Sequence, residues 1–258
     1  MAALHVELVG EGPPIVLAHG FTQTGRLWGP FAVALARHRQ LVSVDLPGHA
    51  GSSTVEADLP TAGELVLDAA ARAGEVPVDL LGYSLGARVA LHAALDHPER
   101  VRRLILIGAT GGIEDDAARA ARRARDEELA DELERDGDLD GFLERWLANP
   151  MFGTLRPDAA EIDERRRNTA AGLASSLRLA GTGTQQPLWD RLATCRVPVL
   201  VLAGANDPRF VVAGLRIAAL TGGVFSAVPG AAHAAHLEQP ALSARFVASW
   251  LSATETPR

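Results

Sequence analysis

The sequence predicts an α/β fold: a mostly parallel central sheet flanked by helices and interrupted by one helical insertion. Short apolar runs alternate along the chain with segments of helical spacing, as in consecutive βαβ units. Most of these runs are continuously apolar, which is typical of parallel strands buried on both faces. A long charged segment without a strand pattern separates the fifth run from the sixth, and it predicts the insertion.

Each expected element follows from its local pattern. Leu4 to Val9 alternates apolar and polar residues, as an edge strand does. The helix that starts near Thr61 carries Glu64 three residues later, the spacing of a capping box. Pro240 suits the first turn of the last helix. We expect strands over 4–9, 15–18, 41–44, 78–81, 101–107, 197–203 and 224–228, and helices over 27–37, 61–73, 85–91, 211–220 and 242–251.

The insertion begins where the composition changes, at Gly112. Residues 114–145 are dense in Asp, Glu and Arg with Ala and Leu between them, a composition that favours helix. We therefore expect a helical cap over residues 112–186, inserted into a core domain formed by residues 1–111 and 187–258. Such a cap should lie over the functional site and shield it from water.

Composition excludes several classes of function. The formal net charge of -7 argues against a nucleic-acid partner. Every basic residue is an arginine, so a Schiff-base lysine is excluded. The single cysteine, Cys195, precludes an intrachain disulfide and is expected to fill apolar space. No apolar run is long enough to span a membrane and no secretory leader is evident, so we expect a cytoplasmic protein.

The motif G-x-S-x-G at residues 82–86 lies between an apolar run and a helical segment. This strand, sharp turn and helix is the context in which the motif presents a reactive serine, here Ser84, at the end of a sheet. The helix that follows directs its N-terminal N–H groups towards the same place. Ser84 is therefore the candidate nucleophile or proton-transfer group.

A serine hydroxyl needs a neighbouring base, usually histidine, and the histidine needs a carboxylate to fix its tautomer. Asp207 and His233 both follow predicted strands, so they should meet Ser84 at one edge of the sheet. Asp45 competes with Asp207, but it lies in a Pro-Gly loop where a carboxylate commonly caps a turn. His236 competes with His233, and we expect it to form structural hydrogen bonds instead.

Two backbone N–H groups should stabilise a developing oxyanion. One belongs to Leu85, the residue after the serine, and the other to Phe21, which follows His19-Gly20 at the end of another predicted strand. Arg88 lies one helical turn after Ser84, on the same side of the helix, and it suits a substrate carboxylate. No metal-ligand spacing is present, and no cofactor is expected.

Several stretches resemble the α/β-hydrolase superfamily and, within it, the 2-succinyl-6-hydroxy-2,4-cyclohexadiene-1-carboxylate synthases of menaquinone biosynthesis. The cap motif W-x-x-x-P-x-F and the tail H-x-x-H-x-E-x-P are the more specific ones. Ala50 and Ala232 stand where glycine is usual. The resemblance covers nearly the whole chain and rests on residues 19–22 (HGFT), 45–49 (DLPGH), 82–88 (GYSLGAR), 122–127, 146–152 (WLANPMF), 167–168 and 233–240 (HAAHLEQP).

The resemblance implies an α/β-hydrolase fold and a lyase that eliminates pyruvate from 2-succinyl-5-enolpyruvyl-6-hydroxy-3-cyclohexene-1-carboxylate by Ser-His-Asp-assisted proton abstraction. It further implies that a small polycarboxylate substrate is bound through Tyr83, Arg88, Arg122, Trp146 and Arg167. Two alternatives stay open on the same fold: a serine hydrolase of esters or carbon–carbon bonds, and a non-catalytic receptor. The sequence carries no signal for an oligomeric state.

Overall fold

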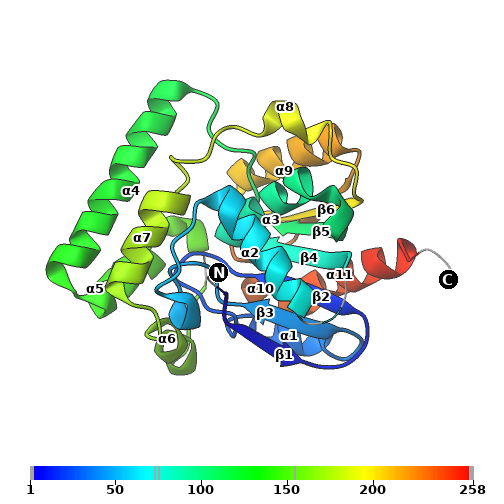
Figure 1. The fold of residues 1–258 in the computed structure, drawn as a ribbon, viewed down its shortest axis with the longest axis horizontal. Helices are drawn as coiled ribbons and strands as arrows, with labels where there is room; N and C mark the ends of the chain where they lie inside the picture. Colours follow the sequence, from blue (N-terminus) through cyan, green and yellow to red (C-terminus); the bar gives the residue numbers. More distant parts are fainter. Residues whose placement is uncertain (1–2, 73, 75, 154, 256–258) are drawn as a thin grey trace.

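A central sheet organises the computed structural model, which describes residues 3–72, 74, 76–153 and 155–255. Within these residues the sheet has seven strands in the order β1-β3-β2-β4-β5-β6-β7 (Figure 1). β1 pairs antiparallel with β3, and every other neighbouring pair is parallel, as predicted. The strands are β1 (Val6–Val9), β2 (Pro14–Ala18), β3 (Gln40–Val44), β4 (Val78–Tyr83), β5 (Val101–Ile107), β6 (Val199–Gly204) and β7 (Val224–Val228).

Helices cover both faces of the sheet, which explains why the central strands are continuously apolar. Val16 and Ala18 pack into the core on one face, and Ile15 and Leu17 pack into the core on the other. The first face is covered by α2 (Leu59–Arg72), α3 (Leu85–Asp96), α8 (Trp189–Leu192) and α9 (Pro208–Thr221). The second is covered by α1 (Gly29–Leu35), α10 (Ala235–Glu238) and α11 (Pro240–Ala253). Two short 3-10 turns, η1 (Ala50–Ser52) and η2 (Pro98–Arg100), lie between β3 and α2 and between α3 and β5.

One local prediction is wrong. α2 begins at Leu59, two residues before the expected start, so Thr61 and Glu64 do not form a capping box. Asp58 supplies the cap instead, because its Oδ1 accepts a hydrogen bond from the N–H of Thr61 at 3.0 Å. An aspartate is as good an N-cap as a threonine, and the sequence offers both.

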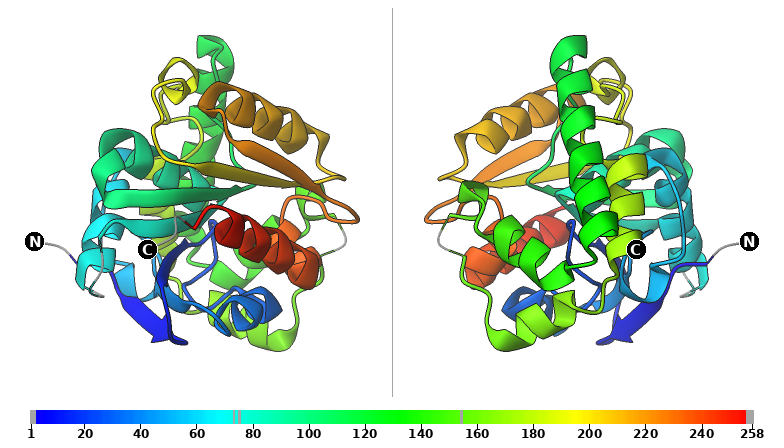
Figure 2. Two further views of the ribbon diagram at one scale, coloured as in Figure 1. Left: turned by 90° about the vertical axis from the view of Figure 1, so that its right-hand side faces the viewer. Right: turned by 90° about the vertical axis from the view of Figure 1, so that its left-hand side faces the viewer.

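The insertion expected over residues 112–186 lies between β5 and α8 and is called the cap here; its described residues are helical or irregular. Figure 1 shows this cap to the left of the sheet, and Figure 2 shows α4 and α7 side by side. Asp115 starts α4 by accepting a hydrogen bond from the N–H of Ala118, and Gly137 ends it at a φ of 61°. The elements are α4 (Asp116–Asp136), α5 (Leu139–Leu147), η3 (Pro150–Phe152), α6 (Ala159–Arg165) and α7 (Ala170–Ala180).

The cap has a small core of its own and returns to the place where it left the sheet. Leu133 of α4, Phe142 of α5 and Leu173 of α7 are buried against one another. The N–H of Leu188 donates to the carbonyl oxygen of Gly111 at 2.7 Å, and the Trp189 indole N–H donates to that of Gly112 at 3.0 Å. The entry and exit of the insertion are therefore tied together. No helix within the described ranges is long and apolar enough to cross a membrane.

Candidate active site

Ser84 occupies the sharp turn between β4 and α3 with a φ of 51° and a ψ of -105°. A positive φ is strained for serine, and the neighbouring glycines make the turn possible. A Cβ on Gly82 would lie 2.2 Å from the carbonyl oxygen of Gly86, and one on Gly86 would lie 1.9 Å from that of Ala18. The motif therefore needs Gly82 for the tightness of the turn itself and Gly86 for the close packing of the turn against β2.

The structure brings Ser84, His233 and Asp207 together. His233 Nε2 lies 3.0 Å from Ser84 Oγ, and its Nδ1 lies 3.2 Å from Asp207 Oδ2. A proton on Nδ1 shared with the carboxylate leaves Nε2 free to accept the serine proton. Asp207 follows β6 and caps α9, and His233 follows β7, so two strand ends position the pair.

The two competing residues are engaged elsewhere. Asp45 Oδ1 accepts a hydrogen bond from the N–H of Gly25 at 2.7 Å, and its Oδ2 accepts one from the N–H of Gly51 at 2.9 Å. Asp45 thus ties two loops together. His236 is fully buried against Trp28 and the Tyr83 ring, whose centroid is 4.3 Å away. Its ring nitrogens have no hydrogen-bond partner among the described residues, so the expected structural hydrogen bonds are absent there.

The backbone N–H groups of Phe21 and Leu85 have no acceptor in the described part of the chain. Both residues line the same cavity as Ser84. His19 supports the Phe21 loop: its Nε2 accepts from the N–H of Leu46 at 3.0 Å, and its Nδ1 lies 2.8 Å from the Gly20 carbonyl oxygen. Burial lowers the pKa of His19 to about 4, so the ring is neutral, as these bonds require. The arrangement suits an oxyanion hole.

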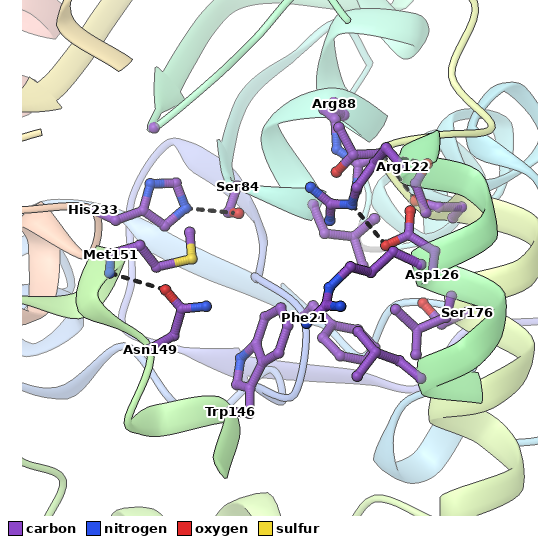
Figure 3. A pocket seen from close by; sticks show the side chains of 18 of the residues that line it. Phe21, Ser84, Arg88, Arg122, Asp126, Trp146, Asn149, Met151, Ser176 and His233 are labelled. Carbon is purple, nitrogen blue, oxygen red and sulfur yellow. Dashed lines mark hydrogen bonds and ion pairs between the residues drawn. The ribbon is translucent and has the colours of Figure 1, made fainter. Parts of the chain in front are cut away.

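A cavity of about 580 Å³ lies between the core and the cap and opens on Ser84 and His233 (Figure 3). Its apolar wall comes from both domains: the ring of Phe21 meets that of Trp146 edge-on at a centroid distance of 5.0 Å. Trp146 stacks in turn on Phe142. The cavity is therefore bounded on this side by the loop that carries Phe21 and by the helix α5.

Arg88 and Arg122 both line the cavity. Arg88 Nη1 donates to the carbonyl oxygens of Ala180 and Gly181 at 2.8 and 3.2 Å, which fastens the end of α7 to α3. Burial lowers the pKa of Arg88 to about 10, so the guanidinium is still charged at neutral pH. Arg122 Nε donates to Asp126 Oδ1 at 2.8 Å, and its side chain is one-third exposed.

The structure does not place Arg167 at the cavity. Its Nη1 pairs with Glu164 Oε1 at 2.5 Å on the surface, and it lines none of the hollows found beside Ser84. Arg165, two residues earlier, is the arginine of this segment that lies beside Ser84. It is 4% exposed and lines a small hollow together with Ser84 and Tyr83. Burial also raises the pKa of Tyr83 far above its ordinary range, so the phenol is protonated.

Sequence reasoning missed three further arginines that line the main cavity, Arg125, Arg145 and Arg209. Arg125 lies within a run of arginines on α4, where no local signal separates inward from outward side chains. Arg209 follows the catalytic candidate Asp207 by two residues, so proximity to that residue was an available signal. Its guanidinium lies 5.6 Å from the Phe210 ring centroid. No group of three or more His, Cys, Asp or Glu in the described ranges could hold a metal ion.

The parallel sheet and the Ser84–His233–Asp207 arrangement are those of an α/β-hydrolase, and comparison with known proteins gives the same class. The sequence model of the Alpha/beta hydrolase family matches residues 15–246, so the chain belongs to that family. A Bacillus subtilis (strain 168) protein assigned as a 2-succinyl-6-hydroxy-2,4-cyclohexadiene-1-carboxylate synthase is 34% identical over 94% of this chain and 93% of its own length. The structure of MenH from S. aureus matches with a TM-score of 0.88 and 26% identity, covering 96% of this chain and 98% of that one.

A second kind of relative acts on an ester. The pimeloyl-(acyl-carrier protein) methyl ester esterase of Xanthomonas campestris pv. campestris (strain B100) is 35% identical over 84% of this chain and 85% of its own length. The two kinds of relative thus match at similar identity, and the choice between their activities depends on the chemistry of the cavity.

Proposed function

We propose that this chain is a 2-succinyl-6-hydroxy-2,4-cyclohexadiene-1-carboxylate synthase, a lyase of menaquinone biosynthesis. It eliminates pyruvate from 2-succinyl-5-enolpyruvyl-6-hydroxy-3-cyclohexene-1-carboxylate. The similarity to the Bacillus subtilis protein and to MenH of S. aureus over nearly the full chain supports this activity. A cytoplasmic location, a small-molecule partner and the absence of a nucleic-acid partner fit such a biosynthetic enzyme and its acidic composition.

The charge of the cavity is the observation that favours this substrate. Five arginines and three carboxylates line it, in a chain whose net charge is -7. Asp126 is already engaged by Arg122, and Glu132 by Arg145, whereas Arg88 donates only to carbonyl groups. Uncompensated positive charge in a partly closed cavity suits a substrate with three carboxylates, which an arginine binds in a bidentate manner.

The reaction needs one base and one anion-stabilising site. His233, acting through Ser84 Oγ, removes a ring proton; the ring carbon–oxygen bond to the enolpyruvyl group then breaks as a ring double bond forms. The departing enolate takes up a proton and leaves as pyruvate, so protons balance. The N–H groups of Phe21 and Leu85 stabilise the charge that develops when the ring proton is removed. No acyl-enzyme is required by this route.

The test is to follow pyruvate release from the purified protein through lactate dehydrogenase and NADH absorbance. Wild-type protein should turn over the pathway substrate, and Ser84→Ala protein should not. A wild-type protein that hydrolyses nitrophenyl esters but releases no pyruvate would overturn the proposal.

The second candidate is ester hydrolysis, which the Xanthomonas relative favours. The same triad would attack an ester carbonyl, and the apolar wall around Trp146 would hold an acyl chain. This activity has no use for the surplus of arginines, so arginine variants should leave ester turnover unchanged. A non-catalytic receptor would gain nothing from a serine held in a strained turn at 3.0 Å from a histidine.

A further inference from the structure

The catalytic candidate His233 lies in an irregular loop between β7 and α10, so something other than secondary structure must fix its position. Three consecutive backbone N–H groups of this loop have acceptors. The N–H of His233 donates to the carbonyl oxygen of Met151 in the cap at 3.2 Å. Those of its neighbours, Ala232 and Ala234, donate to one side chain, the carboxylate of Glu238.

The carboxylate of Glu238 accepts hydrogen bonds from the residues directly before and after His233. The N–H of Ala232 lies 3.1 Å from both carboxylate oxygens, and the N–H of Ala234 lies 3.2 Å from Oε1. The backbone N–H of Glu238 donates to the carbonyl oxygen of Ala234 at 2.9 Å, so α10 and the loop close on each other. Hydrogen bonds to an ionised acceptor are about twice as strong as neutral ones.

Glu238 has no other evident task. It lines neither the main cavity nor the small hollow beside Ser84, so it is not placed to touch a substrate. It takes part in no ion pair within the described ranges, although it is half-buried. Burial raises the pKa of Glu238 above its usual value, against the lowering effect of the backbone N–H groups. Among the described residues, the hydrogen bonds of its carboxylate all go to the loop that carries His233.

We propose that Glu238 is a positioning residue: by accepting the N–H groups on both sides of His233, it holds the imidazole between Ser84 and Asp207. The inference concerns the triad geometry and rests on the catalytic role proposed for these three residues, whichever bond the enzyme breaks. A misplacement of about 1 Å in such a group is enough to reduce the rate about 100-fold.

The test is Glu238→Gln, which keeps the size of the side chain but replaces one acceptor oxygen with a donor that faces N–H groups. We expect kcat for pyruvate release to fall about 10- to 100-fold while KM stays within about twofold. Asp115→Asn is the matched control, because it also replaces a carboxylate with an amide. Asp115 is the exposed N-cap residue of α4 and lies outside the cavity. It should leave both constants unchanged.

A second readout separates this inference from the choice of substrate. A fluorophosphonate probe labels a serine that a histidine activates, and it needs no pathway substrate. Glu238→Gln should slow labelling of Ser84 by the same 10- to 100-fold, with circular dichroism and the unfolding midpoint showing a folded protein. Wild-type protein that labels rapidly but releases no pyruvate would refute the lyase proposal alone. Labelling and kcat within twofold of wild type in folded Glu238→Gln protein would overturn the positioning role.

Discussion

Arg165 is a buried cation that forms no ion pair with a carboxylate among the described residues, and this makes it the sharpest test of substrate recognition. Its Nη1 donates to Thr22 Oγ1 at 2.8 Å, and its buried Nε has no partner among the described residues. Burial lowers its pKa to about 10, so it is charged at neutral pH. A buried charge that no opposite charge neutralises costs several kcal/mol, which a substrate carboxylate beside Ser84 would offset.

Replacing Arg165 with methionine should therefore have opposite effects on catalysis and stability. A hydrogen bond to a charged group is worth about 1.5–3 kcal/mol, so losing the substrate contact should reduce kcat/KM about 10- to 150-fold. The folded protein loses the bond to Thr22 but also the unpaired charge. The unfolding midpoint should consequently stay the same or rise, as when an apolar side chain replaces a buried charged group.

The matched control is Arg167→Met, two residues along and paired with Glu164 on the surface. Arg167 lines neither hollow beside Ser84, so kcat/KM should change less than about twofold. An exposed pair contributes about 0–1 kcal/mol to stability, so the unfolding midpoint should also change little. Pyruvate release measures kcat/KM, and differential scanning calorimetry measures the midpoint. Equal losses in the two variants, or a large fall in the midpoint of Arg165→Met alone, would refute the reasoning, because Arg165 would then be a structural residue.

Three further outcomes follow from the same geometry. Ser84→Ala and His233→Ala should each slow pyruvate release at least about 10³-fold, and the double variant should be no slower than either; additive losses would contradict a shared proton path. Arg125→Ala should raise KM about two- to fivefold, as expected for an exposed charge at the cavity, whereas Arg123→Ala on the same helix should be silent; equal values would show that Arg125 does not meet the substrate. Burial lowers the pKa of His236 from 6.5 to about 3, so below pH 6.5 the unfolded chain binds a proton that the folded chain excludes. The free energy of unfolding should fall as pH drops from 6.5 towards 3, by up to about 1.4 kcal/mol per pH unit for this group. Urea titrations of His236→Phe should show a shallower fall, and an unchanged slope would argue against a neutral buried ring.

The core of this fold could be predicted because each parallel strand is marked in the sequence by a short apolar run. The β5 and β7 boundaries match the predicted 101–107 and 224–228, since both runs are bounded by residues that break the apolar pattern. Ser84, Asp207 and His233 follow strands, and the carboxyl ends of parallel strands share one edge. Sequence position alone is therefore enough to bring the three residues together.

The cap could not be predicted at the same level, because helical periodicity fixes which residues share a face but not which face meets the core. Arg165 is the last residue of α6 and Arg167 lies in the turn that follows it, so the helical pattern does not decide which of the two arginines points inwards. The deciding contact is tertiary: Arg165 reaches Thr22, in the loop after β2, and Asn168 hydrogen-bonds the carbonyl oxygen of the same residue. No local pattern encodes that pairing across more than 140 residues of chain.

The same reasoning explains why the sequence assigns no role to Glu238, although this residue is part of the tail motif H-x-x-H-x-E-x-P. It stands five residues after His233, at the end of a short helix, where a glutamate usually suggests a solvated surface. Its role depends on the direction of two backbone N–H groups, which only the folded loop defines. The cap adds the third restraint through the Met151 carbonyl oxygen, so the loop of the catalytic histidine is held by its own helix on one side and by the cap on the other. A cap that moves during turnover would release one of these restraints while Glu238 maintains the other two, and the histidine would keep its place beside Ser84 as the cavity opens.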